Sequence, residues 1–212
     1  MTEIAYRSYQ PGDAEDIKPI LNEAFYIHRY VSSDTVLDSA LEIYLRECLL
    51  GSTWTRVAVK DGHVVGVIMG RVDGQPRLSG RLTNRLLSLG HMARALLVGV
   101  TQWSSMRQYF AFDRVYAQLR KKTNHPLTDE LTLFAVSATT RGHCVGKALY
   151  AHYMRHLRSH GRSDFYLYTD SLCTFQFYEK QGMNRAASQD MDLVLEGKHE
   201  RLGIYLYTGS AT

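Results

Sequence analysis

Eight residues in the second half of the chain have the composition of an anion-binding loop: Arg141-Gly142-His143-Cys144-Val145-Gly146-Lys147-Ala148. The segment directly follows a predicted strand at residues 131–136 and opens a predicted helix over about 142–160. Glycines let the backbone approach a ligand closely, and a helix N-terminus presents unpaired N–H groups with a partial positive charge. With the charges of Arg141 and Lys147, this arrangement favours phosphate. A glycine turn with solvated basic side chains is the alternative.

Strand and helix patterns alternate on both sides of this loop. Residues 4–9 alternate as in a short strand, and helical patterns follow Asp13 and Asp34. Asp61-Gly62 lies between two β-rich runs, which is a strong hairpin signal. After the loop, the sequence predicts a strand at 165–169, a short helix at 174–181, and strands near 191–195 and 204–207. This alternation is typical of an α/β fold.

Residues 75–125 separate the hairpin from the strand at 131–136 and are too many for a plain loop in a compact domain. Two helices fit this segment, with apolar faces at Leu82, Leu86, Leu89, Ala93, Leu96 and Leu97 and at Met106, Phe110, Tyr116 and Leu119. The segment has nine basic residues and one acidic residue, so its net charge is +8, whereas the rest of the chain is −4. The sequence therefore predicts a mildly acidic domain that carries a basic helical insertion.

The composition excludes several classes of protein. The chain has 212 residues, 45% hydrophobic and 22% charged, which is typical of a globular domain. Its three cysteines, Cys48, Cys144 and Cys173, are widely spaced and form no CxxC pair, so neither a disulfide framework nor a zinc site is expected. The sequence predicts no signal peptide and no membrane-spanning run. We therefore expect a cytoplasmic protein without a metal. The net charge of +4 is too small to argue for nucleic acid by itself, and nucleic acid is not the expected partner.

Two segments together resemble signatures of the GNAT superfamily, the acyl-CoA-dependent N-acetyltransferases. The family pattern of a strand, Val-x-Pro-x-x-Arg/Gln-Gly-x-Gly-Ile/Val-Gly and a helix is similar to the stretch from Val136 to Gly146. The family segment Phe-Tyr-Glu-Lys-x-Gly-Phe resembles residues 177–183, from Phe177 to Met183. The resemblance implies one GNAT-like domain over residues 1–212. It also implies an α/β fold with a mixed, mostly antiparallel central sheet splayed at the cofactor site, flanking helices and the insertion.

Two positions depart from the family pattern. Cys144 replaces the middle glycine of the loop, so its side chain needs room, although its N–H can still face a phosphate. Ser171 stands where many members have asparagine, and its hydroxyl can still donate and accept a hydrogen bond. Both positions therefore stay in the expected cofactor-binding set.

The resemblance implies acetyl-CoA as co-substrate and assigns roles to the residues around it. Phe134, Ala135 and Val136 are expected to line the pantetheine arm, with the Val136 N–H near the thioester carbonyl. The loop residues 141–148 are expected to hold the phosphates. Tyr178 matches the family's general acid, which protonates the leaving thiolate, and such catalysis contributes about 10²–10⁴-fold. A packing role on a short amphipathic helix is the alternative for Tyr178.

The attacking amine must lose its proton, because an amine with a pKa of about 10.4 is almost entirely charged at neutral pH. Glu130 begins the strand before the loop and is the predicted general base by position. Asp170 closes the neighbouring strand and is the second choice. A solvated carboxylate at a strand end is the alternative for each. The acceptor that fits this chemistry is a small-molecule or protein amine.

A second class of function stays open from the sequence. In that alternative the fold is a non-enzymatic module that binds CoA, or nothing, and uses the basic insertion to recruit a partner. The added helices could also form a homodimer surface. In either case we expect residues 75–125 to govern the choice of acceptor or partner.

Overall fold

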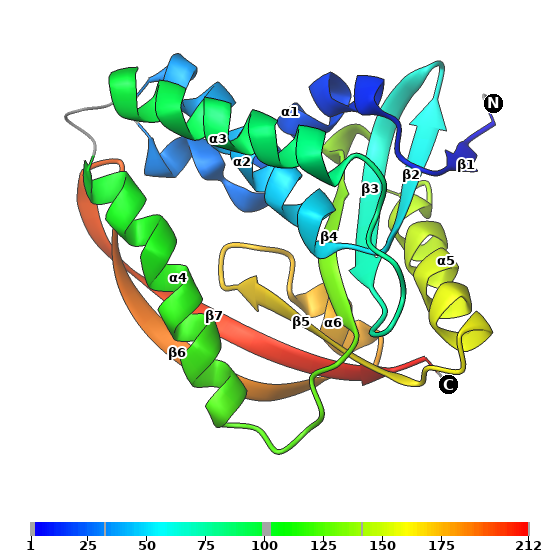
Figure 1. Ribbon diagram of the computed structural model, residues 1–212. Helices are drawn as coiled ribbons and strands as arrows, with labels where there is room; N and C mark the ends of the chain where they lie inside the picture. Colours follow the sequence, from blue (N-terminus) through cyan, green and yellow to red (C-terminus); the bar gives the residue numbers. More distant parts are fainter. Residues whose placement is uncertain (1–2, 32, 99–102, 141, 212) are drawn as a thin grey trace.

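The computed structural model describes residues 3–31, 33–98, 103–140 and 142–211 of the chain. An open seven-stranded sheet in the order β1-β2-β3-β4-β5-β7-β6 carries helices on both faces (Figure 1). β4 and β5 are parallel, and the other neighbouring strands are antiparallel. This confirms the expected α/β fold with a mostly antiparallel sheet. The strands and helices are β1 (Ala5–Arg7), α1 (Ala14–Phe25), α2 (Asp34–Gly51), β2 (Trp54–Lys60), β3 (His63–Arg71), α3 (Arg81–Val98), α4 (Trp103–Lys121), β4 (Glu130–Val136), α5 (Val145–Ser159), β5 (Asp164–Asp170), α6 (Gln176–Lys180), β6 (Asn184–Leu195) and β7 (Lys198–Ser210).

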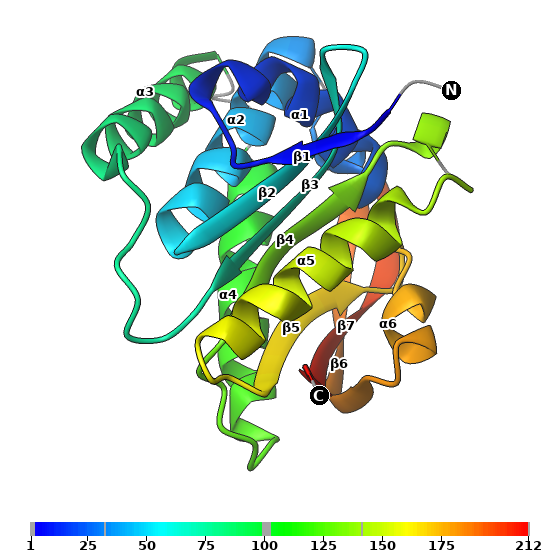
Figure 2. The same ribbon diagram turned by 90° about the vertical axis from the view of Figure 1, so that its right-hand side faces the viewer.

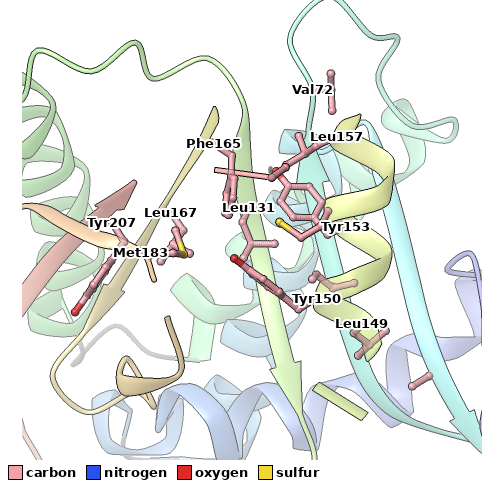
Figure 3. Close-up of a cluster of buried hydrophobic side chains, with 14 of the residues drawn as sticks. Val72, Leu131, Leu149, Tyr150, Tyr153, Leu157, Phe165, Leu167, Met183 and Tyr207 are labelled. Carbon is pink, nitrogen blue, oxygen red and sulfur yellow. The ribbon is translucent and has the colours of Figure 1, made fainter. Parts of the chain in front are cut away.

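Helices with apolar stripes cover both faces of the sheet around β3 and β4. On one face, α1 and α2 bury Ile17, Leu21 and Leu45 against the strands. On the opposite face lies α5 (Figure 2), whose inward side chains meet those of β4 and β5 in the cluster drawn in Figure 3. Because burying each such side chain contributes about 1.5–3 kcal/mol, these two layers hold β4 firmly in place.

β4 diverges from β5 along its length. The pairing between β3 and β4 skips Thr132, so β4 has a β-bulge at this residue. A bulge bends its strand and increases the local twist. Glu130 pairs with Tyr166 of β5, and the described residues contain no further pair between these two strands. The sheet therefore opens toward the C-terminal ends of β4 and β5, which confirms the predicted splay.

The helix after β4 begins later than the sequence predicted. The pattern placed its start at about residue 142, but α5 begins at Val145. The difference has a backbone cause, because Gly142 and Cys144 both have positive φ angles and cannot belong to a right-handed helix. The helix ends at Ser159, one residue before the expected boundary.

α4, the second helix of the insertion, packs against β6 and β7 (Figure 1). Its inward face includes Val115, which is buried, and Leu119, which has no exposed surface. Tyr116 is half-buried beside them. The predicted apolar face is therefore confirmed over the C-terminal part of α4, while the side chains of Met106 and Phe110 lie outside the described part of the chain.

α3, the first helix of the insertion, packs on α2 through polar side chains. Ser88 donates a hydrogen bond of 2.8 Å to Glu47, and Arg94 lies 3.7 Å from Asp38. Four leucines of the predicted helical face are turned to solvent instead, and their exposed fractions are 73% for Leu82, 60% for Leu86, 54% for Leu89 and 82% for Leu97. The side chain of Leu96, which belongs to the same predicted face, lies outside the described part of the chain. A surface helix usually buries its apolar stripe, so the sequence correctly predicted a helix here but not the direction of its apolar face.

The C-terminal half of the sheet is a long hairpin of β6 and β7 that pairs with β5. Glu196 and Gly197, both with positive φ angles, form its two-residue turn, as hairpins of this kind require. Among the described residues, none of the helices has the length and apolar character needed to cross a membrane.

Candidate acetyl-CoA and amine site

A cavity of about 350 Å³ lies where β4 and β5 diverge. Its walls come from the end of α1, from α2, β4, the turn after β4, the end of β5, and α6. The residues selected from the sequence that line it are Phe134, Ala135, Val136, Gly142, Cys144, Val145, Gly146 and Tyr178. The structure thus brings the two sequence signatures together around one cavity.

The backbone of β4 presents hydrogen-bonding groups to this opening. Gly66 and Val136 lie opposite each other in β3 and β4. The next hydrogen bond between the strands joins the residues that flank this pair, because the Ser137 N–H donates to the Val65 carbonyl at 3.0 Å. Such a pair is of the non-hydrogen-bonded type, so the N–H and C=O of Val136 point away from β3 and toward β5. The same groups of Phe134, two residues earlier, point the same way. Because β5 has already diverged, these groups face the gap between the strands.

Two residues with left-handed backbone conformations shape the turn between β4 and α5. Gly142 has a φ of 83°, and Cys144 has a φ of 57°. The left-handed conformation costs a residue with a Cβ about 1–2 kcal/mol, which is the physical reason that glycine suits the position of Cys144. The Cys144 side chain is exposed at the rim of the cavity, so it has the room it needs. Arg141, which the sequence assigned to phosphate, lies outside the described residues.

The first turn of α5 contributes Val145 and Gly146 to the cavity wall and has N–H groups without a partner in the helix. The first helical hydrogen bond runs from the Ala148 N–H to the Cys144 carbonyl at 2.9 Å, so the preceding N–H groups have no partner within the helix. They carry the partial positive charge of the helix dipole. Of the predicted loop residues that are described, His143, Lys147 and Ala148 lie outside the cavity wall, and the His143 N–H donates to Thr140 at 3.2 Å.

Tyr178 lies on α6 and forms part of the cavity wall. Burial raises the pKa of its hydroxyl well above the ordinary value of a tyrosine, so the group keeps its proton at neutral and mildly alkaline pH. The next residue, Glu179, fixes the helix on β7 and β6, because it accepts a hydrogen bond of 2.7 Å from Tyr207 and pairs with Arg185 at 2.7 Å. Tyr178 is therefore a protonated donor on an anchored helix.

Glu130 lies at the closed end of the gap, where β4 and β5 still pair. Its carboxylate pairs with Arg71 at 2.8 Å and accepts a hydrogen bond of 2.9 Å from the Tyr166 hydroxyl. Arg120 of α4 donates to the same hydroxyl at 2.9 Å. Glu130 is not part of the cavity wall. Its role as general base stays a prediction, and the structure shows a carboxylate held in a network of its own.

Asp170, the second candidate base, lies beside the cavity at the end of β5. It accepts hydrogen bonds from the Leu172 N–H at 2.8 Å, the Cys173 N–H at 3.1 Å and the Cys173 thiol at 3.4 Å. Burial raises the pKa of Asp170, although these hydrogen bonds lower it. Since Thr169 and Cys173 both line the cavity, the Asp170 carboxylate is one side chain away from it.

Ser171 joins the end of β5 to β7. Its N–H donates to the Gly203 carbonyl at 2.8 Å, and its hydroxyl accepts from the Gly203 N–H at 3.1 Å. Ser171 does not line the cavity. Its expected contact with the cofactor stays a prediction.

The sequence analysis missed the side chains on the other side of the cavity. Glu23 of α1, Tyr44 of α2 and Tyr168 of β5 all line it, although they are far apart in the sequence. Glu23 accepts a hydrogen bond of 3.1 Å from the Ala138 N–H, just after β4. No local motif marks these positions. The one available signal was the pair of tyrosines at alternate positions of β5, Tyr166 and Tyr168, which must share a face of the sheet.

The cavity fits the thioester arm and the phosphates of acetyl-CoA. The outward N–H and C=O groups of β4 match an amide-containing chain, and the N-terminus of α5 matches phosphate. Gly146 leaves open the space where a Cβ would stand 3.5 Å from the Phe134 ring. Within the described ranges, no three His, Cys, Asp or Glu residues gather in a group that could hold a metal ion.

Comparisons with known proteins support this fold. Neither protein-family models nor curated protein sequences match the chain. A Desulfovibrio desulfuricans protein assigned to the GNAT acetyltransferases matches 99% of this chain and 100% of its own, with a TM-score of 0.55 and 15% identity. PaiA N-acetyltransferase of Thermoplasma acidophilum, in complex with coenzyme A, matches 98% of this chain and 99% of its own, with a TM-score of 0.51 and 14% identity. The acetyltransferase yncA of Salmonella typhimurium, with its cofactor acetyl-CoA, matches 99% of this chain and 94% of its own, with a TM-score of 0.52 and 15% identity. The chain has the fold of the GNAT acetyltransferases, as the two sequence signatures implied.

Proposed function

We propose that the protein is an N-acetyltransferase that moves an acetyl group from acetyl-CoA to a primary amine by direct attack. The observation that carries this proposal is the opening between β4 and β5, which joins the turn at Gly142 and Cys144 and has Tyr178 on its wall. Structures of the same fold contain coenzyme A and acetyl-CoA, which supports the same co-substrate here.

In this proposal, the backbone of the chain holds the co-substrate. The outward groups of Phe134 and Val136 bind the pantetheine amides, and the first turn of α5, which contains Lys147, binds the phosphates. The charge of Arg141 is assigned to the phosphates from the sequence alone. The Val136 N–H donates to the thioester oxygen as negative charge develops there. Removing such a donor typically costs about 3–4 kcal/mol of transition-state stabilisation.

Two side chains move protons. Tyr178 gives its proton to the sulfur of the leaving thiolate, and its raised pKa keeps that proton in place until it is needed. Asp170 takes the proton of the attacking amine, because its burial raises its pKa and it lies next to the cavity through Cys173. Glu130 is the alternative base. The amine nitrogen forms the new bond to the acetyl carbon as the bond from that carbon to sulfur breaks.

The test is a thiol-release assay with acetyl-CoA across a panel of amines, combined with calorimetry of acetyl-CoA binding. We expect acetyl-CoA to bind and at least one amine to be acetylated. Tyr178→Phe keeps the ring and should lower kcat by about 10²–10⁴-fold. Tyr205→Phe, at a tyrosine outside the cavity wall, serves as the matched control. Absence of acetyl-CoA binding, or equal kcat values for the two variants, would overturn the proposal.

The second candidate function is a partner-recruiting module without catalysis. The exposed leucines of α3 are the observation in its favour, because a stripe of apolar side chains in water is unusual for a helix of a monomer. The same experiment separates the two functions. A module of this kind binds CoA, or nothing, but releases no thiol with any amine.

A further inference from the structure

The cavity has a second half, away from the β4 backbone, that is built from side chains. Phe25 and Tyr44 form one side of it, with ring centroids 5.3 Å apart. Tyr168 forms another side and stacks on Tyr116 of α4, with ring centroids 4.2 Å apart and an interplanar angle of 23°. The insertion thus supports a wall of this half directly. The half is predominantly aromatic.

Further aromatic rings continue this wall behind the cavity. Phe112 of α4 lies 6.1 Å from the ring of Tyr116 and 6.3 Å from that of Tyr30. Burial and, next, the charge of the Asp170 carboxylate raise the pKa values of Tyr30 and Tyr116. The aromatic wall surrounds the end of β5, where the amine must arrive.

The described side chains that line the cavity include a carboxylate but no cationic group. Of the described residues that line the cavity, Glu23 is the one with a charged side chain at neutral pH, and none is lysine, arginine or histidine. Asp170 adds a second carboxylate behind Cys173. Arg120 of α4 lies behind the wall and donates hydrogen bonds to Tyr166 and Tyr168. Glu23 and the aromatic rings therefore attract an ammonium group to this half, whereas a carboxylate meets no lysine, arginine or histidine among the described residues of the wall.

We propose that the acceptor is a primary amine on a flat aromatic group and carries no acidic substituent. This inference rests on the proposed acetyl transfer. The ring of the acceptor lies between the aromatic side chains of α1, α2 and β5, and its amino group lies toward Glu23 and Asp170. Tyr168 is a specificity-determining residue, and Tyr116 and Arg120 of the insertion are positioning residues that act through it.

The test compares kcat/KM for 2-phenylethylamine, hexylamine and phenylalanine at saturating acetyl-CoA. Both amines carry the same ammonium group, so contacts between the phenyl ring and the aromatic side chains should favour 2-phenylethylamine over hexylamine by about tenfold. The added carboxylate of phenylalanine should reduce kcat/KM by about 100-fold. Calorimetric titration of 2-phenylethylamine and phenylalanine into the CoA-saturated protein gives the same comparison for binding, without turnover.

Variants of the cavity wall show which side chains cause the preference for the phenyl ring. Tyr168→Leu should reduce the preference for the ring to about twofold or less, while Tyr168→Phe, which keeps the ring, should retain it. Tyr44→Leu is a second ring deletion on a different element, in case Tyr168→Leu does not fold. Leu86→Ala, on the exposed face of α3, is the control and should leave the preference unchanged.

The outcomes separate this inference from the proposed function. Transfer to hexylamine or phenylalanine as efficient as that to 2-phenylethylamine would overturn the acceptor class and leave acetyl transfer in place. Absence of transfer to any amine would overturn the proposed function and this inference with it. An unchanged ring preference in both Tyr168→Leu and Tyr44→Leu would contradict the assigned wall.

Discussion

The two halves of the cavity are built in different ways. The half assigned to acetyl-CoA uses the backbone of β4, the turn at Gly142 and the N-terminus of α5, which are continuous in the sequence. The half assigned to the amine uses side chains from α1, α2 and β5, supported by α4. A constant co-substrate can be bound by backbone groups, while side chains on separate elements can be exchanged to suit different acceptors.

The comparison also explains the two helices of the insertion. α4 buries Leu119 against the hairpin of β6 and β7 and places Tyr116 and Arg120 in contact with Tyr168, which lines the cavity. α3 lies on α2 through polar contacts and leaves its leucines in water. α4 therefore supports the wall of the acceptor half from behind, whereas α3 packs on α2.

The largest expected effect concerns the base in the acceptor half. Asp170→Asn should lower kcat/KM at neutral pH by about 10²–10⁴-fold. A base must be deprotonated to act, and burial raises the pKa of Asp170, so the acidic limb of the wild-type pH profile should lie above the range of an ordinary aspartate. The variant should lose this limb. If Glu130→Gln loses it instead and Asp170→Asn keeps it, Glu130 is the base.

The next effect is on stability. Leu119→Ala removes a fully buried side chain of α4 and should lower the free energy of unfolding by about 2–5 kcal/mol. It should also raise the KM for the amine while the calorimetric affinity for acetyl-CoA stays the same. Leu86→Ala on α3 should change stability by less than about 0.5 kcal/mol. Equal losses in the two variants, measured by denaturant unfolding, would show that the two helices do not differ as described.

A smaller effect is expected at Arg120. Its side chain donates hydrogen bonds of 2.7 Å to Tyr168 and 2.9 Å to Tyr166. Arg120→Gln should loosen Tyr168 and raise the KM for the amine by about fivefold, equivalent to about 1 kcal/mol. The KM for acetyl-CoA should not change. Arg94→Gln, which removes an exposed arginine of α3, is the control. A rise in the KM for acetyl-CoA would contradict the separation of the halves.

The smallest effect is expected in the cofactor half. Cys144→Gly removes the strain of a side chain in the left-handed conformation, at the expense of the greater freedom of glycine in the unfolded chain. The net result should be about 0.5–1 kcal/mol of added stability. Acetyl-CoA affinity should rise slightly, and amine preference should stay the same. A loss of stability in thermal unfolding would mean that contacts of the Cys144 side chain stabilise the fold by more than its backbone strain destabilises it.

Much of the cofactor half could be predicted from the sequence. The loop from Gly142 to Gly146 and the segment around Tyr178 are local patterns, and their chemistry depends on glycine freedom, helix ends and one hydroxyl group. The start of α5 was missed by three residues, because helical periodicity does not show that Cys144 adopts a positive φ angle. Arg141 lies outside the described residues, so its phosphate contact stays a prediction.

The acceptor half could not be predicted in the same way. Tyr44 and Tyr168 reach one cavity only because α2 packs on β3 and β4 and β5 is the next strand of the sheet, and no spacing along the chain records that. The leucines of α3 show the same limit, since periodicity predicts an apolar face but not its direction. Glu130 was chosen by its position at the start of a strand, and the structure places it in an ion pair with Arg71 outside the cavity wall.

The sequence by itself determined the elements that depend on local interactions: the strands, the helices, the turn glycines and the two signatures that meet at the cofactor half. The tertiary structure alone decided which distant side chains share the acceptor half, and that α4 rather than α3 supports it. The physical reason is the distance along the chain over which the interactions act. Backbone conformation and helix ends are set by neighbours in the chain, whereas burial, pKa shifts and cavity walls are set by long-range packing.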